Sequence, residues 1–145
     1  MILATGGMLL AVATAEADSG FGAVHGNWCG AGNRVGQGGE VLPPVDLLDT
    51  ACMRHDFCIA RHGVGDCGCD GYFLYELRHL PYPNPHQATK ARAIYDAMSW
   101  LPCAGPAAVT KPLWFFGQLV EDLHSGGPPP WDVVRRLFYA LEHPW

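Results

Sequence analysis

His55 and Asp56 stand side by side in a segment whose residue types could carry acid–base chemistry. Residues 43–58 are predicted to form one helix, because Pro44 suits a first helical turn and the glycines at 63 and 65 suit a stop. At about 100° per residue, the predicted inward face comprises Val45, Leu48, Ala51, Cys52, His55, Ile59 and His62. An imidazole near the centre of that face is either a hydrogen-bonded core residue or a general base.

A second helix is predicted from Asp66 to Leu80, and it carries a carboxylate, Asp70, on its apolar face. The other residues of that face are Cys67, Phe73, Leu74 and Leu77. The connection between the two helices is short, so they should run antiparallel, with His55 and Asp70 within about one turn of the same level. Such a pair satisfies both groups, either as a structural contact or as a general base with its orienting carboxylate.

A glycine-rich loop, residues 25–33, precedes the first of these helices. Its glycines at 26, 30 and 32 permit backbone conformations that turn carbonyl oxygens inward. Calcium accepts carbonyl ligands readily, so a few carbonyls and one nearby carboxylate would form a site. The alternative is an ordinary surface turn.

Three motifs in this order resemble the calcium-dependent secreted phospholipase A2 family. They are Gly-x-Trp-Cys-Gly-x-Gly from Gly26, Pro-x-Asp-x-x-Asp-x-x-Cys-x-x-His-Asp-x-Cys from Pro44, and Cys-x-Cys-Asp from Cys67. The resemblance covers residues 26–80 and implies hydrolysis of the sn-2 ester of a phospholipid, at a membrane or micelle surface. A catalytically silent module that binds lipid or a receptor on the same scaffold is the alternative.

The resemblance also assigns roles to single residues. It makes His55 the general base and Asp70 its buried partner. It implies that one Ca²⁺ is held by the Asp56 carboxylate and by the backbone carbonyls of Trp28, Gly30 and Gly32. The N–H of Gly30 would help to stabilise the oxyanion. The expected fold is therefore mostly α, a disulfide-stapled helical domain with an antiparallel catalytic helix pair and a Gly-rich calcium loop.

The chain departs from the family pattern around Asp70. The link from His55 to Asp70 is too short for the family's β-hairpin, which predicts a compact form. Ile59 stands where the family has a tyrosine, so we expect Tyr72, Tyr75 or water to complete the hydrogen bonds of Asp70.

Six cysteines, an even number, predict three disulfides and an oxidising compartment. Cys58 and Cys69 should be level across the helical hairpin. The resemblance pairs Cys29 with Cys52, which leaves Cys67 and Cys103 for each other. A zinc module built from three of these cysteines and a histidine is a competing hypothesis, although Cys-x-Cys spacing suits zinc poorly.

Length and composition favour a secreted single domain. The 145 residues are 49% hydrophobic, and the net charge of −5 gives no basic stripe for nucleic acid. Residues 1–17 are predicted to be a signal peptide, with a plain N-terminal helix as the alternative. Residues 18–145 would then form one domain, with a core motif over residues 25–80 and a helical extension over residues 85–145.

Three helices are predicted in that extension. The first runs from Pro85 to Leu101 after a cap at Asn84, and the others cover residues 112–124 and 132–142. The last is expected to bury Val133, Val134, Leu137, Phe138 and Leu141. The aromatic residues from Trp114 to Phe116 either pack in the core or contact a lipid interface.

Overall fold

The computed structural model describes residues 23–30, 40–126 and 132–143, which form five helices and one short hairpin. The element bounds are β1 Ala23–His25, β2 Cys29–Gly30, α1 Leu47–His62, α2 Cys67–His79, α3 Pro85–Trp100, α4 Lys111–Ser125 and α5 Asp132–Glu142. The predicted disulfide-stapled, mostly helical domain is confirmed. The proposed signal peptide, residues 1–17, lies outside the described residues.

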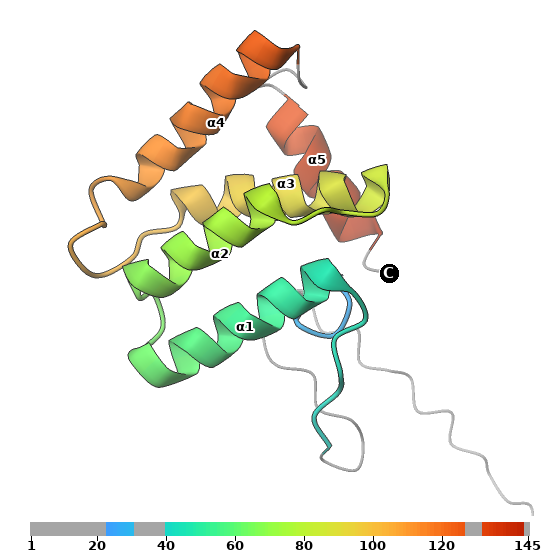
Figure 1. Cartoon of the computed structure of the whole chain (residues 1–145), viewed down its shortest axis with the longest axis vertical. Helices are drawn as coiled ribbons and strands as arrows, with labels where there is room; N and C mark the ends of the chain where they lie inside the picture. The colour runs from blue at the N-terminus through green and yellow to red at the C-terminus, as the bar shows by residue number, and fades with distance from the viewer. Residues whose placement is uncertain (1–22, 31–39, 127–131, 144–145) are drawn as a thin grey trace, which may run out of the picture.

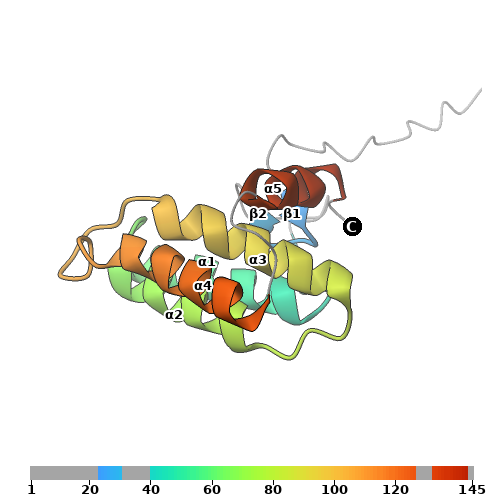
Figure 2. The ribbon, with the colours of Figure 1, turned by 90° about the horizontal axis from the view of Figure 1, so that it is seen from above.

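Helix α3 is the centre of the arrangement. Figure 1 shows α1, α2, α3 and α4 following one another as a stack, and α3 packs against α2, α4 and α5. The view from above in Figure 2 places α5 on the side of α3 where the β1–β2 hairpin lies. The C-terminal helices α4 and α5 therefore cover two faces of α3, the helix that packs against α2.

Helix α1 begins later than the proline pattern predicts. Its N-cap is Asp46, whose side chain accepts a hydrogen bond from the N–H of Asp49 at 2.9 Å, so Pro44 lies before the helix. Because the chain is still extended there, Val45 is 59% exposed, and its predicted burial is wrong. The predicted burial of His62 is also wrong, since the last turn of α1 projects into solvent.

Helices α2 and α3 begin where they were predicted to begin, and each has a side-chain cap. Asp66 accepts from the N–H of Cys69, and Asn84 accepts from the N–H of Gln87, each at 2.9 Å. Short polar side chains satisfy helix N–H groups that have no intrahelical acceptor, so these two starts could be read from residue type. The inward face predicted for α2, including Asp70, is buried throughout.

The three predicted disulfides are all present. Their Cα atoms are 5.1, 5.7 and 5.1 Å apart, for Cys29–Cys52, Cys58–Cys69 and Cys67–Cys103 respectively. These bonds occupy every cysteine of the chain. The alternative zinc module, which needs thiolates, is therefore wrong.

The predicted buried face of α5 is wrong. Val134, Phe138 and Leu141 are 60%, 58% and 47% exposed, whereas Arg136 and Ala140 are buried. The reason is ionic: the Arg136 guanidinium donates two hydrogen bonds to Asp96 of α3, at 2.9 and 3.2 Å. A buried charge requires a partner, and this pair turns the polar side of α5 towards α3.

The β1–β2 hairpin depends on Gly26. Its φ is +56°, and a Cβ at this position would overlap the carboxylate of Asp49. Glycine is thus required twice, by its backbone conformation and by the close approach of a side chain.

We predict that Gly26→Ala lowers the free energy of unfolding by about 2 kcal/mol or more, because positive φ is costly and the Asp49 carboxylate must move. Gly117→Ala in α4 is the control: a Cβ there meets nothing within 4 Å. That control should raise stability by about 0.5–1 kcal/mol. Urea denaturation measures both, and equal effects of the two substitutions would contradict the role given to Gly26.

Candidate active site

His55 and Asp70 form the contact that their spacing predicts. His55 Nε2 lies 2.9 Å from Asp70 Oδ1, and the two side chains are 12% and 4% exposed. The imidazole also stacks on Phe73, with ring centroids 4.5 Å apart. Because Asp70 engages Nε2, Nδ1 is the ring nitrogen left to accept a proton. Two antiparallel helices therefore hold one imidazole in a fixed orientation.

The second oxygen of Asp70 is bonded by a residue that sequence reasoning did not select. Lys111, at the start of α4, directs Nζ at Asp70 Oδ2 and also donates to the carbonyl of Leu101 at 2.8 Å. The expected partners Tyr72 and Tyr75 are instead 60% and 53% exposed, on the outer side of α2. The only signal in the sequence is that Lys111 is a lone charge before an apolar run.

Opposing effects act on the Asp70 carboxyl. Burial alone would raise its pKa, but the hydrogen bonds from His55 and Lys111, with their positive charge, hold its pKa below the usual value. Asp70 therefore carries its negative charge at neutral pH. A charged carboxylate against Nε2 is the form that stabilises an imidazolium.

His55 opens onto a cavity of about 340 Å³. Most of its lining is apolar, and α3 and α5 contribute Ile94, Met98 and Leu137 to it. The lining ranges from fully buried Ala140 to partly exposed Leu137, so the cavity runs from the surface into the core. Its size lies within the range of small-molecule sites, and its walls suit a hydrocarbon chain.

The candidate cation ligands border the same cavity. Trp28, Gly30 and Asp56 line it beside His55, while Gly32 lies outside the described residues. Burial, with a contribution from Asp49, raises the pKa of Asp56 to about 6, although His55 acts in the opposite direction. A nearby cation would stabilise the charged form of a carboxylate that burial disfavours in this way.

The donor set fits a hard cation that accepts backbone oxygens. Within residues 23–30, 40–126 and 132–143, no three His, Cys, Asp or Glu side chains gather as a metal site. Calcium accepts backbone carbonyl oxygens beside a carboxylate, and zinc prefers nitrogen and sulfur ligands.

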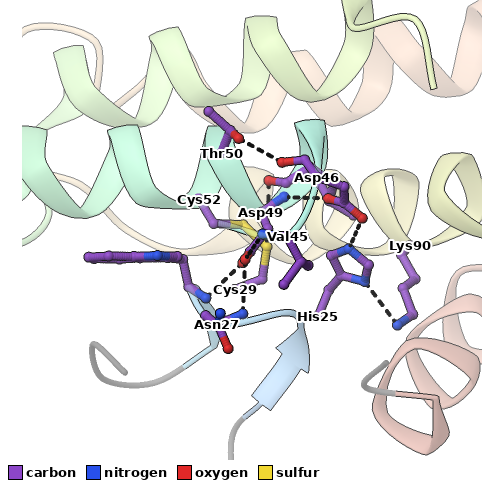
Figure 3. Close-up of a disulfide and its surroundings, with 11 residues drawn as sticks. His25, Asn27, Cys29, Val45, Asp46, Asp49, Thr50, Cys52 and Lys90 are labelled. Carbon is purple, nitrogen blue, oxygen red and sulfur yellow. Dashed lines mark hydrogen bonds and ion pairs between the residues drawn. A yellow bond between two sulfur atoms is a disulfide. The ribbon is translucent and has the colours of Figure 1, made fainter. Parts of the chain in front are cut away.

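Asp49 fixes the loop against α1. Its fully buried carboxylate accepts hydrogen bonds from the backbone N–H groups of Asn27, Trp28 and Val45, at 2.9, 2.7 and 3.0 Å (Figure 3). The Cys29–Cys52 disulfide joins the same two segments. The sequence alone assigns no role to Asp49, because its partners are backbone groups that leave no signal in the sequence.

A second His–Asp pair lies near the loop. His25 Nε2 is 2.6 Å from Asp46 Oδ2, and Lys90 Nζ is 3.1 Å from His25 Nδ1 (Figure 3). Both ring nitrogens are thus engaged, and His25 and Lys90 are buried. This histidine has no free nitrogen for a base and is a structural link between β1, α1 and α3.

Comparison with protein-family models, with curated proteins and with solved structures finds no match to this chain. In the part of the chain that the structure describes, no helix has the length and apolarity needed to cross a membrane. Any functional assignment therefore has to come from the residues of the site itself.

We predict that Asp56→Asn stabilises the calcium-free protein above pH 6. The folded-state pKa of Asp56, about 6, exceeds its ordinary value of 3.8, so its charge opposes folding above pH 6 and has no effect below pH 3.8. Allowing for solvent screening, the gain should be about 1 kcal/mol at neutral pH and should vanish near pH 4.

Chemical denaturation in the presence of a chelator measures this difference as a function of pH. Glu40→Gln, which neutralises an exposed carboxylate, is the control and should change stability by less than about 0.5 kcal/mol. A gain from Asp56→Asn that stays constant between pH 4 and neutral pH would show that the charge of Asp56 is not its cause.

Proposed function

We propose that this chain is a calcium-dependent phospholipase A2, which hydrolyses the sn-2 ester of glycerophospholipids to a free fatty acid and a lysophospholipid. One observation carries the proposal: the His55–Asp70 pair, joined at 2.9 Å, opens onto an apolar cavity that Asp56 and Gly30 also line. Three features that the proposed reaction needs are thus adjacent: a candidate base with its carboxylate partner, a carboxylate suited to a cation, and space for an acyl chain.

In the proposed reaction, His55 takes a proton from a water molecule, whose oxygen attacks the carbonyl carbon of the ester. Nδ1 performs this step, since Nε2 is engaged by Asp70. Asp70 maintains the tautomer and stabilises the imidazolium that forms. When the ester C–O bond breaks, the imidazolium returns the proton to the alkoxide oxygen of the leaving lysophospholipid.

The cation ligands in this proposal are the Asp56 carboxylate and the carbonyls of Trp28, Gly30 and Gly32. Calcium, when bound, would polarise the ester carbonyl and offset the negative charge that develops on its oxygen. The N–H of Gly30 would donate to that same oxygen. Asp49 supports this arrangement indirectly, because it fixes the backbone from which Trp28 and Gly30 project.

The proposed substrate surface is a phospholipid membrane or micelle, and the proposed location is extracellular. Exposed aromatic residues on α4, Trp114 and Phe116, are of the kind that lipid interfaces favour. Three disulfides are typical of extracellular proteins. No basic stripe in the sequence favours a nucleic-acid partner.

A catalytically silent lipid-binding or receptor-binding module is the second candidate. The observation that favours it is the cavity itself, since an apolar space of about 340 Å³ could hold a lipid chain without chemistry. The two candidates differ in one measurement: the silent module binds lipid and releases no fatty acid.

We predict that His55→Gln reduces fatty-acid release from phosphatidylcholine vesicles by about 100-fold or more, because a general base contributes that much to such reactions. The purified, oxidised chain is assayed with calcium and with excess chelator. His62→Gln, which replaces an exposed histidine at the end of the same helix, is the control and should keep full activity. Full activity in His55→Gln would contradict its assignment as the base.

We predict that Asp56→Lys abolishes both calcium binding and fatty-acid release, because a cation then occupies the place of the carboxylate ligand. Isothermal titration with calcium measures the binding, and Glu40→Lys, at an exposed position, controls for the change in net charge. An unchanged calcium titration in Asp56→Lys would mean that the cation binds elsewhere. Calcium binding by a wild-type chain that releases no fatty acid would favour the silent module.

A further inference from the structure

We propose that Lys111 is a positioning residue for the His55–Asp70 pair: it holds the Asp70 carboxylate in the orientation and the charged form that His55 needs in order to act as a base. This inference rests on the proposed function, and it adds a residue that lies outside the motifs of the site.

Asp70 is the charged partner of Lys111. The Lys111 side chain is 4% exposed, and its ammonium group contacts Asp70 Oδ2 and donates to the Leu101 carbonyl. A buried ammonium group is costly unless it is paired and hydrogen-bonded, and here it has both kinds of partner. The two oxygens of Asp70 thus serve two donors, with Oδ1 bonded to His55 and Oδ2 to Lys111.

Removing Lys111 would affect His55 through the carboxylate. Oδ2 would be left buried without a donor, which is unfavourable for a carboxylate oxygen. The carboxylate can recover part of this by rotating away from Nε2 or by taking up a proton. A rotated carboxylate no longer fixes the tautomer of His55, and a protonated one no longer stabilises the imidazolium. The positive charge of Lys111 also offsets part of the negative charge of Asp70. Even so, Asp70 can stabilise the imidazolium of His55 only while its carboxylate is ionised and aligned with Nε2.

A purely structural role for Lys111 would be to attach α4 to α2. A second ion pair already joins these helices, between Arg78 of α2 and Glu121 of α4, and it does not involve Asp70. Glu121→Gln is therefore a matched control, because it removes an α2–α4 ion pair and leaves the His55–Asp70 pair intact. If attachment of α4 were the only role of Lys111, Lys111→Met would leave the tautomer of the His55 ring as it is in wild type.

The test is a double-mutant cycle on fatty-acid release from phosphatidylcholine vesicles in calcium. We expect Lys111→Met to lower kcat by about ten-fold or more with KM unchanged, as losses of outer-shell partners do. In an Asp70→Asn background the same substitution should cost less than about two-fold, since a residue that acts through Asp70 loses its effect once Asp70 is neutral. Glu121→Gln should keep the wild-type kcat.

A measurement without substrate accompanies the cycle. The ¹⁵N shifts of the His55 ring, recorded at about pH 8.5, where a histidine is ordinarily neutral, report its tautomer. Wild type and Glu121→Gln should show one tautomer, protonated at Nε2, and Lys111→Met should show a mixture. If Lys111→Met does not fold, Lys111→Gln replaces it; it removes the positive charge and keeps an N–H donor, so the same changes are expected with a smaller size.

The outcomes separate this inference from the proposed function. Fatty-acid release by wild type together with an equal cost of Lys111→Met in both backgrounds overturns the inference and leaves the phospholipase assignment standing. If Lys111→Met keeps both the wild-type tautomer of His55 and the wild-type kcat, the inference is likewise overturned and the phospholipase assignment still stands. No release by wild type overturns the proposed function, and this inference with it, before any substitution is made.

Discussion

One buried carboxylate, Asp49, holds the loop and the helix of the site together. It accepts hydrogen bonds from three backbone N–H groups, two in the loop and one before α1. Backbone donors have fixed directions, so a carboxylate that serves three of them fixes the path of the chain more tightly than apolar contacts would. The positions of Trp28, Gly30 and the Cys29–Cys52 disulfide all follow from this contact. This contact is also why position 26 requires glycine, since no side chain fits between the loop and the Asp49 carboxylate.

Charged pairs also determine how the C-terminal helices are placed. Helix α4 is joined to α2 through Lys111 and Asp70, and α5 is joined to α3 through Arg136 and Asp96. These ionic contacts direct the polar sides of α4 and α5 inward, so part of their apolar surface faces outward. A buried ion pair contributes little net stability, but breaking it leaves an uncompensated buried charge, which disfavours packings that separate Lys111 from Asp70 or Arg136 from Asp96.

The parts of the fold that could be predicted are those controlled by local chemistry. Asp66 and Asn84 are helix caps by residue type, and the His55–Asp70 contact follows from two helices joined by a short link. The missed parts depend on contacts between distant segments. Lys111 lies 41 residues from Asp70 along the chain, and the buried side of α5 is set by Asp96, 40 residues from Arg136. Hydrophobic periodicity assumes that apolar residues face inward, and α5 is the helix where an ion pair reverses that assumption.

The three disulfides share a topological property: their covalent framework ends at Cys103. Helices α1, α2 and α3 lie within the linked segment, whereas α4 and α5 are attached only by non-covalent contacts. Each of these two helices can therefore detach by local unfolding while every cross-link stays intact. Detachment of α4 takes Lys111 from Asp70, and detachment of α5 removes a wall of the cavity. Disulfides alone therefore do not hold the site together: loss of α4 would remove the ion pair of Asp70, and loss of α5 would open the cavity, with every cross-link intact.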